Sequence, residues 1–266
     1  MNLNFITDHV LFDVRDRVAY ITLNDPKNMN PVPAEVMKDL IECLNYCEQE
    51  SGVRAIVIRG AGGNFTAGGN VKGMKERLDK GINTTKYGIR SGGELIMRLK
   101  SICKPTIAWI EGAVAGVGMS IAMACDFSIA EETAKMVFAF VNIGFIPDGG
   151  VSYMLSKAVG PVKATELLMS GKRFTGAQAA EWGIITEAVP AEALEETVQK
   201  YIKKYSSGPS VAYAQMKRLL MSVNYQELNA CMQSEVEAQY VCSLTQDHRE
   251  AVTAFVEKRK PVFKGC

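Results

Sequence analysis

The stretch that decides the fold is residues 112–130, which read GAVAGVGMSIAMACDFSIA. It follows an apolar strand predicted over Thr106–Ile110. The stretch itself combines a glycine-rich loop, a helical segment MSIAMACD with almost no polar face, and the start of another apolar run. A helix without a polar face has to be buried. The pattern therefore predicts a strand, a loop and a helix that lies inside the protein.

The same arrangement occurs on either side of this stretch. Val53–Arg59 is a β-branched apolar run, followed by the loop GAGGNFTAGGN and a helix-like pattern after Asn70. A further unit follows at Phe127–Ile129 and Met136–Phe140. Strands that alternate with helices at this spacing indicate parallel strands joined by crossovers, so we expect an α/β fold.

The two ends of the chain have a different character. Val10–Val14 and Val18–Leu23 predict a hairpin, and a helix is expected to begin at about Ala34, after an Asn- and Pro-rich loop. From Ala191 onward the pattern predicts amphipathic helices, over 191–204, 211–222 and 225–241, and a last helix that ends near residue 260. We expect a core over residues 1–200 and a C-terminal helical region over residues 201–266.

Bulk composition excludes several classes of protein. The 266 residues are 47% hydrophobic and 22% charged, which is typical of an ordered globular protein. Lys and Arg number 30 against 29 Asp and Glu, so charge gives no reason to expect a nucleic acid or a membrane as partner. The N-terminal residues show no secretory pattern, and the seven scattered cysteines predict reduced thiols. We expect a cytoplasmic protein.

The two glycine-rich loops, residues 60–70 and 112–118, are the first candidates for a site. Each precedes a helix, and the N-terminus of a helix presents backbone N–H groups that have no intrahelical partner. Neither loop has the spacing of a phosphate-binding motif, which disfavours a nucleotide. Two interpretations stay open: an oxyanion hole made of backbone amides, or ordinary close-packed turns.

Asp148 is the best titratable candidate, because it lies between an apolar run and two glycines in IGFIPDGGVSY. Burial there would raise the pKa of its carboxyl group and suit it to proton transfer. The alternative interpretation is a turn or a helix N-cap. His9 and His248 are expected to be surface residues. No metal site is predicted, and Ser120 is expected to be a packed helical hydroxyl.

Four segments of the sequence resemble the crotonase, or enoyl-CoA hydratase/isomerase, family. In order, they are NDPKNMNPV, NFTAGGNVKGM, GAVAGVGMSIAMACDFSIA and AFVEKRKPVFKG. The resemblance implies a spiral of β-β-α units, a C-terminal helical trimerisation region, and assembly into homotrimers or homohexamers. It implies an acyl-CoA thioester as substrate and no separate cofactor, because coenzyme A is part of the substrate.

Site residues follow from the resemblance position by position. The oxyanion donors would be the backbone N–H groups of Gly69 and Val117. The acyl pocket would include Met74, Ser120, Phe140 and Asn142. The coenzyme A path would be lined by Lys27, Asn28, Met29, Ala67 and Gly68, while Phe263 and Lys264 would reach the coenzyme A of a neighbouring subunit.

Departures from the family pattern favour one reaction over another. Hydratases of this family use two catalytic glutamates, and the sequence places Ser120 and Asn142 at those positions. It carries Asp148 instead, at the position of a functional aspartate in dienoyl-CoA isomerases. The run AFVNIGFIPDGG also resembles the ring-opening isomerases of phenylacetyl-CoA breakdown. We therefore expect an enoyl-CoA isomerase with Asp148 as its one acid/base.

Other functions remain open on the same scaffold. One is a hydratase acting on an enoyl-CoA or a cyclic dienoyl-CoA, with Ser120 assisting Asp148. Another is an acyl-CoA hydrolase or a dehalogenase, although the residues that a dehalogenase needs cannot be placed. The last is a non-catalytic binding protein, and near-zero net charge argues against one that binds RNA.

Overall fold

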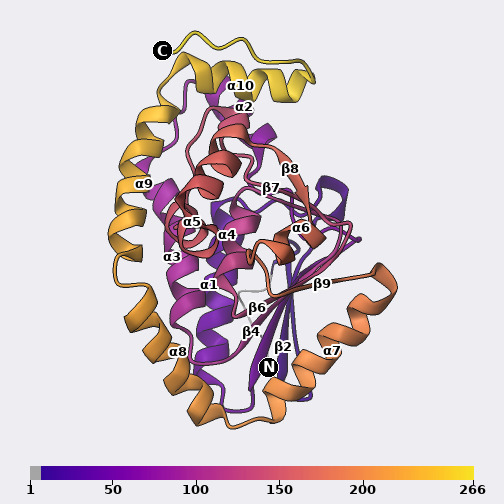
Figure 1. The fold of residues 1–266 in the computed structure, drawn as a ribbon. Helices are drawn as coiled ribbons and strands as arrows, with labels where there is room; N and C mark the ends of the chain where they lie inside the picture. Colours follow the sequence, from indigo (N-terminus) through magenta and orange to yellow (C-terminus); the bar gives the residue numbers. More distant parts are fainter. Residues whose placement is uncertain (1–6) are drawn as a thin grey trace.

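The computed structural model describes residues 7–266, in which two sheets form the centre of the molecule (Figure 1). The main sheet has the strand order β1-β2-β3-β4-β6-β9, and only β1 runs antiparallel to its neighbour. A small sheet has the order β5-β7-β8. The strands are β1 (Val10–Arg15), β2 (Val18–Leu23), β3 (Ala55–Gly60), β4 (Thr106–Ile110), β5 (Ala113–Ala115), β6 (Phe127–Glu131), β7 (Lys135–Val137), β8 (Arg173–Thr175) and β9 (Glu187–Val189).

Helices connect and cover these strands. Those of the N-terminal part are α1 (Ala34–Gln49), α2 (Val71–Asp79), α3 (Lys86–Ser101), α4 (Val117–Ala124), α5 (Val151–Ser170) and α6 (Gly176–Glu181). The C-terminal part is built from α7 (Ala191–Ser207), α8 (Ser210–Asn224), α9 (Leu228–Ser243) and α10 (Gln246–Glu257), and the short 3-10 helices are η1 (Pro26–Asn28) and η2 (Val141–Ile143). The mixed α/β fold expected from the sequence is confirmed.

Both faces of the main sheet are covered, which explains why its strands are apolar throughout. Ile56 and Ile58 of β3 belong to the large core that the helices α1, α3 and α4 complete. The residue between them, Val57, points to the opposite face and packs with Val198 and Ile202 of α7. All residues of α4 except Met123 are buried, so the helix without a polar face lies inside the protein as predicted.

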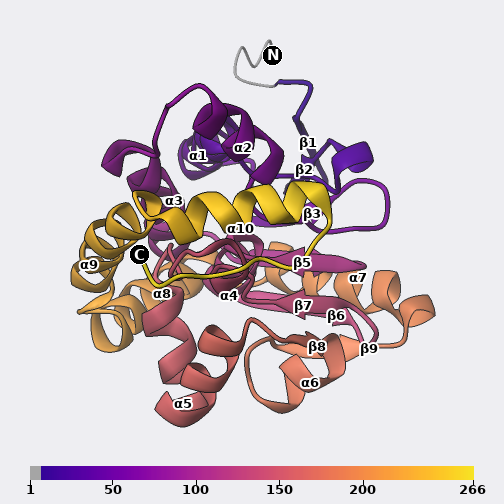
Figure 2. The ribbon, with the colours of Figure 1, turned by 90° about the horizontal axis from the view of Figure 1, so that it is seen from above.

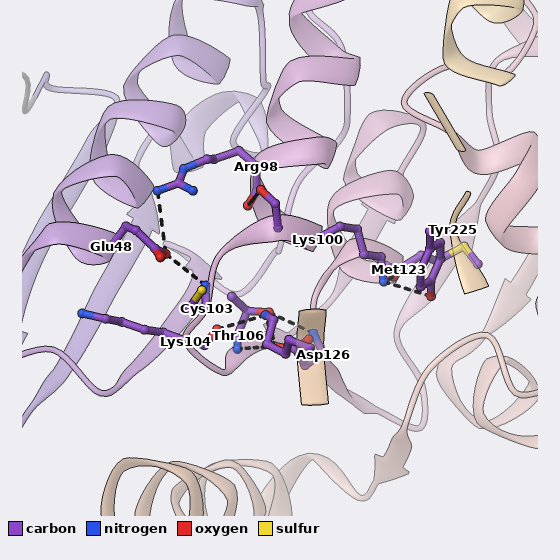
Figure 3. Close-up of polar contacts among 11 residues, drawn as sticks. Glu48, Arg98, Lys100, Cys103, Lys104, Thr106, Met123, Asp126 and Tyr225 are labelled. Carbon is purple, nitrogen blue, oxygen red and sulfur yellow. Dashed lines mark hydrogen bonds and ion pairs between the residues drawn. The ribbon is translucent and has the colours of Figure 1, made fainter. Parts of the chain in front are cut away.

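Polar contacts fix the end of the main sheet where α3 turns into β4 (Figure 3). Both the backbone N–H and the hydroxyl of Thr106 donate to the carboxylate of Asp126, at 2.8 and 2.9 Å. Lys217 of α8 reaches the same carboxylate and lies mostly out of solvent. Lys100 of α3 donates to the carbonyl of Met123 and to the Tyr225 hydroxyl. These contacts attach α8 to the core.

The C-terminal helices return along the body of the same chain. In Figure 1, α9 runs beside α3 and α10 lies at the top; Figure 2, seen from that side, shows α10 crossing in front with the last residues alongside it. Asp247 holds this final segment, since its carboxylate accepts hydrogen bonds from the backbone N–H groups of Lys264 and Gly265, at 2.7 and 2.9 Å. None of the described helices is both long and apolar enough to cross a membrane.

Several features differ from the sequence-based expectations. The helices α5 and α6 and the short strand β5 were not predicted, and α5 is broken at Gly160, where φ is 76° before Pro161. The prediction that His248 is a surface residue is wrong. His248 is 1% exposed, stacks on Phe145 with ring centroids 3.9 Å apart, and bonds through Nδ1 to the carbonyl of Ile143 at 2.7 Å. Its charged sequence neighbours Asp247 and Arg249 are only partly exposed.

Candidate active site

The two glycine-rich loops lie side by side in the structure. Thr66 and Val114 form a parallel bridge, in which the N–H of Ala115 donates to the carbonyl of Thr66 at 3.0 Å. Three residues further along each loop stand Gly69 and Val117. The parallel register therefore brings the two predicted oxyanion donors to the same end of the paired loops.

The absence of side chains lets these loops approach so closely. Gly68 has a φ of 86°, and a Cβ atom at this position would lie 2.6 Å from the carbonyl oxygen of Ala115. A Cβ atom on Gly118 would lie 2.3 Å from a methyl carbon of Thr66. Real Cβ atoms do not come this near to their neighbours, so both positions require glycine.

The two amides are free to bind an anion. Val117 is the first residue of α4, and Gly69 stands just before α2, whose N-cap residue Asn70 accepts the N–H of Gly73 at 2.9 Å. Within residues 7–266, neither the N–H of Gly69 nor that of Val117 donates a hydrogen bond to the protein. Both amides stand at or just before the start of a helix, where positive potential favours an anion. The arrangement suits a carbonyl oxygen that gains negative charge.

Ser120 connects this end of α4 to the candidate acid/base. It lies one helical turn after Val117, is fully buried, and donates from its hydroxyl to the backbone carbonyl of Asp148 at 3.1 Å. The next residue, Gly149, packs directly on the Ser120 side chain. The packed helical hydroxyl expected from the sequence is confirmed, and its contact fixes the Asp148 loop relative to the oxyanion donors.

The carboxyl group of Asp148 is buried and incompletely bonded. Its Oδ2 accepts a hydrogen bond from Nε2 of Gln239 at 2.8 Å, while Oδ1 is buried and has no partner among residues 7–266. Burial raises the pKa of this carboxyl group to about 7; the Gln239 hydrogen bond lowers it and the nearby Glu235 carboxylate raises it. Near neutral pH the group therefore exists in both protonation states. The helix N-cap is not Asp148 but Gly150.

Glu235 is a second buried carboxylate that the sequence did not single out. Its Oε2 accepts the N–H of Gly150 at 2.7 Å and its Oε1 accepts the N–H of Ser152 at 3.2 Å. These amides belong to the start of α5, where a negative charge is stabilised by the helix dipole. Burial raises the pKa of Glu235, and the two backbone donors lower it. Its oxygens are thus occupied in holding the start of α5.

A cavity of about 790 Å³ between α3 and α9 leads to this region. Asp148 and Gly149 line it together with apolar side chains such as Met97 and Met232. A second cavity of about 730 Å³, between α8 and the core, contains none of the predicted catalytic or coenzyme A residues.

Comparison with known proteins decides the family. The family model described as enoyl-CoA hydratase/isomerase matches residues 13–266. The chain belongs to the enoyl-CoA hydratase/isomerase family. It is 31% identical to the 1,2-epoxyphenylacetyl-CoA isomerase of Escherichia coli K12, over 97% of this chain and 99% of that one. It is 33% identical to a probable enoyl-CoA hydratase of Bacillus subtilis, over 93% and 95% of the two chains.

Solved structures agree on the fold. A crystal structure of an enoyl-CoA hydratase from Mycobacterium avium subsp. paratuberculosis K-10 superposes with a TM-score of 0.88 at 31% identity, covering 96% of this chain and 98% of that one. The crotonase fold expected from the sequence is thus confirmed. Names among the relatives include both isomerases and hydratases, so the family does not by itself decide the reaction.

The loop that the family resemblance assigns to coenzyme A is tied to the first oxyanion loop. The backbone N–H of Ala67 donates to the carbonyl of Met29 at 2.7 Å, and that of Val32 donates to the carbonyl of Gly68 at 2.8 Å. Asn30, which the sequence analysis passed over, is buried and donates through Nδ2 to the carbonyls of Ala61 and Asn64, each at 2.8 Å. Lys27, Asn28 and Met29 are exposed beside it.

The remaining predicted residues occupy four different places. A Cβ atom added to Gly69 would lie 3.0 Å from the methyl end of Met74, so this side chain stands next to a predicted oxyanion donor. Phe140 is buried in the core. Asn142 is exposed and donates to the carbonyl of Gly171 at 3.2 Å, so it is not brought to the Asp148 carboxyl group. Phe263 and Lys264 are exposed in the final segment.

Proposed function

We propose that this protein is an acyl-thioester double-bond isomerase in which Asp148 moves one proton between two carbons. The thioester oxygen of a 3-enoyl substrate would lie between the N–H groups of Gly69 and Val117. Asp148 removes a proton from C2; the electron pair of the broken C–H bond enters the C1–C2 bond, and negative charge develops on the thioester oxygen.

The second half of the reaction returns the same proton. Asp148 delivers it to C4, where the π electrons of the C3–C4 bond form the new C–H bond. The enolate collapses and leaves the double bond between C2 and C3. No atom is gained or lost overall, so one carboxyl group and two backbone donors suffice.

The observation that carries this proposal is the burial of the Asp148 carboxyl group and its incomplete hydrogen bonding. Because burial raises its pKa to about 7, it is basic enough to accept a proton and acidic enough to return it near neutral pH. One of its oxygens, Oδ1, forms no hydrogen bond within residues 7–266, so its lone pairs are available to take up a proton. The neighbouring Glu235 is already occupied by the backbone of α5.

Hydration is the second candidate, supported by the names of several relatives. Addition of water across a double bond by this family uses two carboxylates, as the resemblance implies. Here Ser120 stands in place of one of them, and its hydroxyl is occupied by the carbonyl of Asp148. Hydrolysis of the thioester is a further alternative on the same scaffold.

Mass spectrometry of the products separates these reactions. A 3-enoyl-CoA incubated with the protein in deuterated water should keep its composition apart from exchanged hydrogen and yield the 2-enoyl isomer. Gain of one water would indicate hydration, and release of free coenzyme A would indicate hydrolysis. One relative is named as an isomerase of an acyl-carrier-protein substrate, so the same acyl group should also be offered on that carrier.

We further propose that the protein assembles into homotrimers or homohexamers. No residue of α8 is buried, although the helix exposes several large apolar side chains. These are Val211, Met216, Leu219, Leu220 and Val223. A row of apolar side chains on one exposed helix is typical of a protein interface. In such an assembly, Phe263 and Lys264 would approach the coenzyme A of a neighbour, and Lys27, Asn28 and Met29 would line its path in their own subunit.

A further inference from the structure

The helix α9 reaches the Asp148 loop with two polar side chains. Glu235 and Gln239 are four residues apart, on one face of the helix, and each is 4% exposed. Glu235 accepts two backbone N–H groups at the start of α5. Gln239 instead bonds to the Asp148 carboxylate. One side chain therefore holds the backbone of the loop, and the other holds its acid/base.

A buried acid/base has to be stable both with and without its proton. A carboxylate only accepts hydrogen bonds, whereas a carboxylic acid also donates one. Within residues 7–266, Gln239 is the one side chain bonded to the Asp148 carboxyl group. Its Nε2 donates, while its Oε1 is buried and has no partner in the described part of the chain.

An amide side chain can match both states of a carboxyl group. Its NH₂ group serves the carboxylate, and half a turn about the last side-chain bond would present Oε1 to the protonated acid. The unused Oε1 of Gln239 is the acceptor that this second state needs. An ammonium group at this position would instead favour the ionised form alone.

The other groups around Asp148 do not replace this function. Ser120 of α4 bonds to the backbone carbonyl rather than to the carboxyl group. Arg90 and Glu94 of α3 line the same cavity but form no hydrogen bond or ion pair with Asp148 within the described part of the chain. His248 of α10 bonds to Ile143, and Glu235 of α9 contributes negative charge near Asp148.

We propose that Gln239 is a positioning residue whose amide turns to match each protonation state of Asp148 during proton transfer. The inference deepens the proposed function and rests on it. Gln239 does not touch the reacting carbons; it acts through the carboxyl group. Loss of the amide should therefore slow turnover and shift the titration of Asp148 while acyl-CoA binding stays nearly unchanged.

Gln239→Met keeps the length of the side chain and removes both the donor and the acceptor. We expect kcat to fall about tenfold or more, with the dissociation constant of a saturated acyl-CoA within about twofold of wild type. Because the Gln239 hydrogen bond lowers the pKa of Asp148, its removal should move the ascending limb of the pH–rate profile to higher pH. Gln199→Met, at an exposed position on α7, is the matched control.

Gln239→Glu is the second variant. It keeps the inference testable if Gln239→Met fails to fold. A protonated glutamic acid supplies a donor and an acceptor, as the amide does, so activity relative to wild type at the same pH should be partly retained at acidic pH. It should be lost as the new carboxyl group ionises beside Asp148.

Infrared titration of the Asp148 carboxyl band, identified by its absence in Asp148→Asn, measures the pKa without turnover. The inference would be overturned if Asp148 titrated in Gln239→Met as it does in wild type and the variant kept the wild-type kcat. Full turnover in Asp148→Asn would instead overturn the proposed function.

Discussion

The carboxylate of Asp148 and the amide of Gln239 lie 2.8 Å apart, although 91 positions separate them in the chain. The first belongs to the loop before α5, and the second to a helix that runs along the outside of the molecule (Figure 1). The proposed acid/base is therefore contacted by the C-terminal helical region of the same chain. Two consequences for Asp148, and two for other parts of the structure, can be measured.

Replacing Asp148 by Asn should remove catalysis and preserve binding. The amide nearly keeps the shape of the side chain but cannot accept a proton from carbon, so kcat should fall about 10²–10⁴-fold. Binding of acyl-CoA, followed by calorimetry, should change little because the oxyanion donors are backbone groups. Asp13→Asn, at an exposed position on β1, should leave both quantities unchanged.

The stability of the protein should depend on pH through Asp148. The ordinary pKa of this group is 3.8 and burial raises it to about 7, so between these values the folded chain holds a proton that the unfolded chain has lost. Stability contributed by the acid form is therefore lost as pH rises towards 7. Relative to wild type, Asp148→Asn should gain roughly 2–4 kcal/mol between pH values of about 4 and 8.

Urea unfolding at several pH values measures this difference. Burial lowers the pKa of His248, which gives an opposite slope, but that contribution is common to both proteins and cancels in the comparison. An equal pH dependence in wild type and Asp148→Asn would contradict the burial of the carboxyl group.

Adding a methyl group to Gly68 should separate the two oxyanion loops. Gly68 and Gly63 both have positive φ, but only at Gly68 would a Cβ atom meet another loop, at 2.6 Å from the carbonyl of Ala115. Gly63→Ala should cost about 1 kcal/mol of backbone strain. Gly68→Ala should cost about 1–3 kcal/mol more and also reduce kcat. Thermal unfolding of the two variants makes the comparison, and equal losses would show that the loops are not in contact.

A charge on the exposed apolar face of α8 should break the assembly. Leu219 is 63% exposed in the isolated chain, so Leu219→Asp should leave the fold of each subunit intact and shift the mass towards that of a monomer. Sedimentation velocity measures the mass. Val162→Asp, at an exposed apolar position on α5, is the control. A monomeric wild-type protein would contradict the proposed assembly.

Local sequence pattern predicted the parts of the fold that depend on local properties. The hairpin of β1 and β2, the strand β4 and the buried helix α4 all lie where apolar periodicity placed them. The helix α5 was harder to predict because Gly160 and Pro161 interrupt it. The expected division at residue 200 lies within α7 and remains a proposal.

The site was predictable where one segment carries its own chemistry. The apolar surroundings of Asp148 indicated a raised pKa, which the structure confirms. Glu235 and Gln239 carry no such signal, because a polar residue on an amphipathic helix is normally exposed. The same reasoning made His248 look like a surface residue, although it packs on Phe145. Such residues depend on contacts between segments far apart in the chain.

In the proposed reaction, Asp148 alone shifts a double bond beside a thioester held by two backbone amides. Ultraviolet absorbance of the conjugated thioester tests it most directly, with the protein mixed separately with a 3-enoyl-CoA and with a 2-enoyl-CoA. We expect absorbance to rise with the 3-enoyl substrate, and Asp148→Asn to abolish the rise. A fall in absorbance with the 2-enoyl substrate, and no rise with the 3-enoyl one, would show hydration and contradict it.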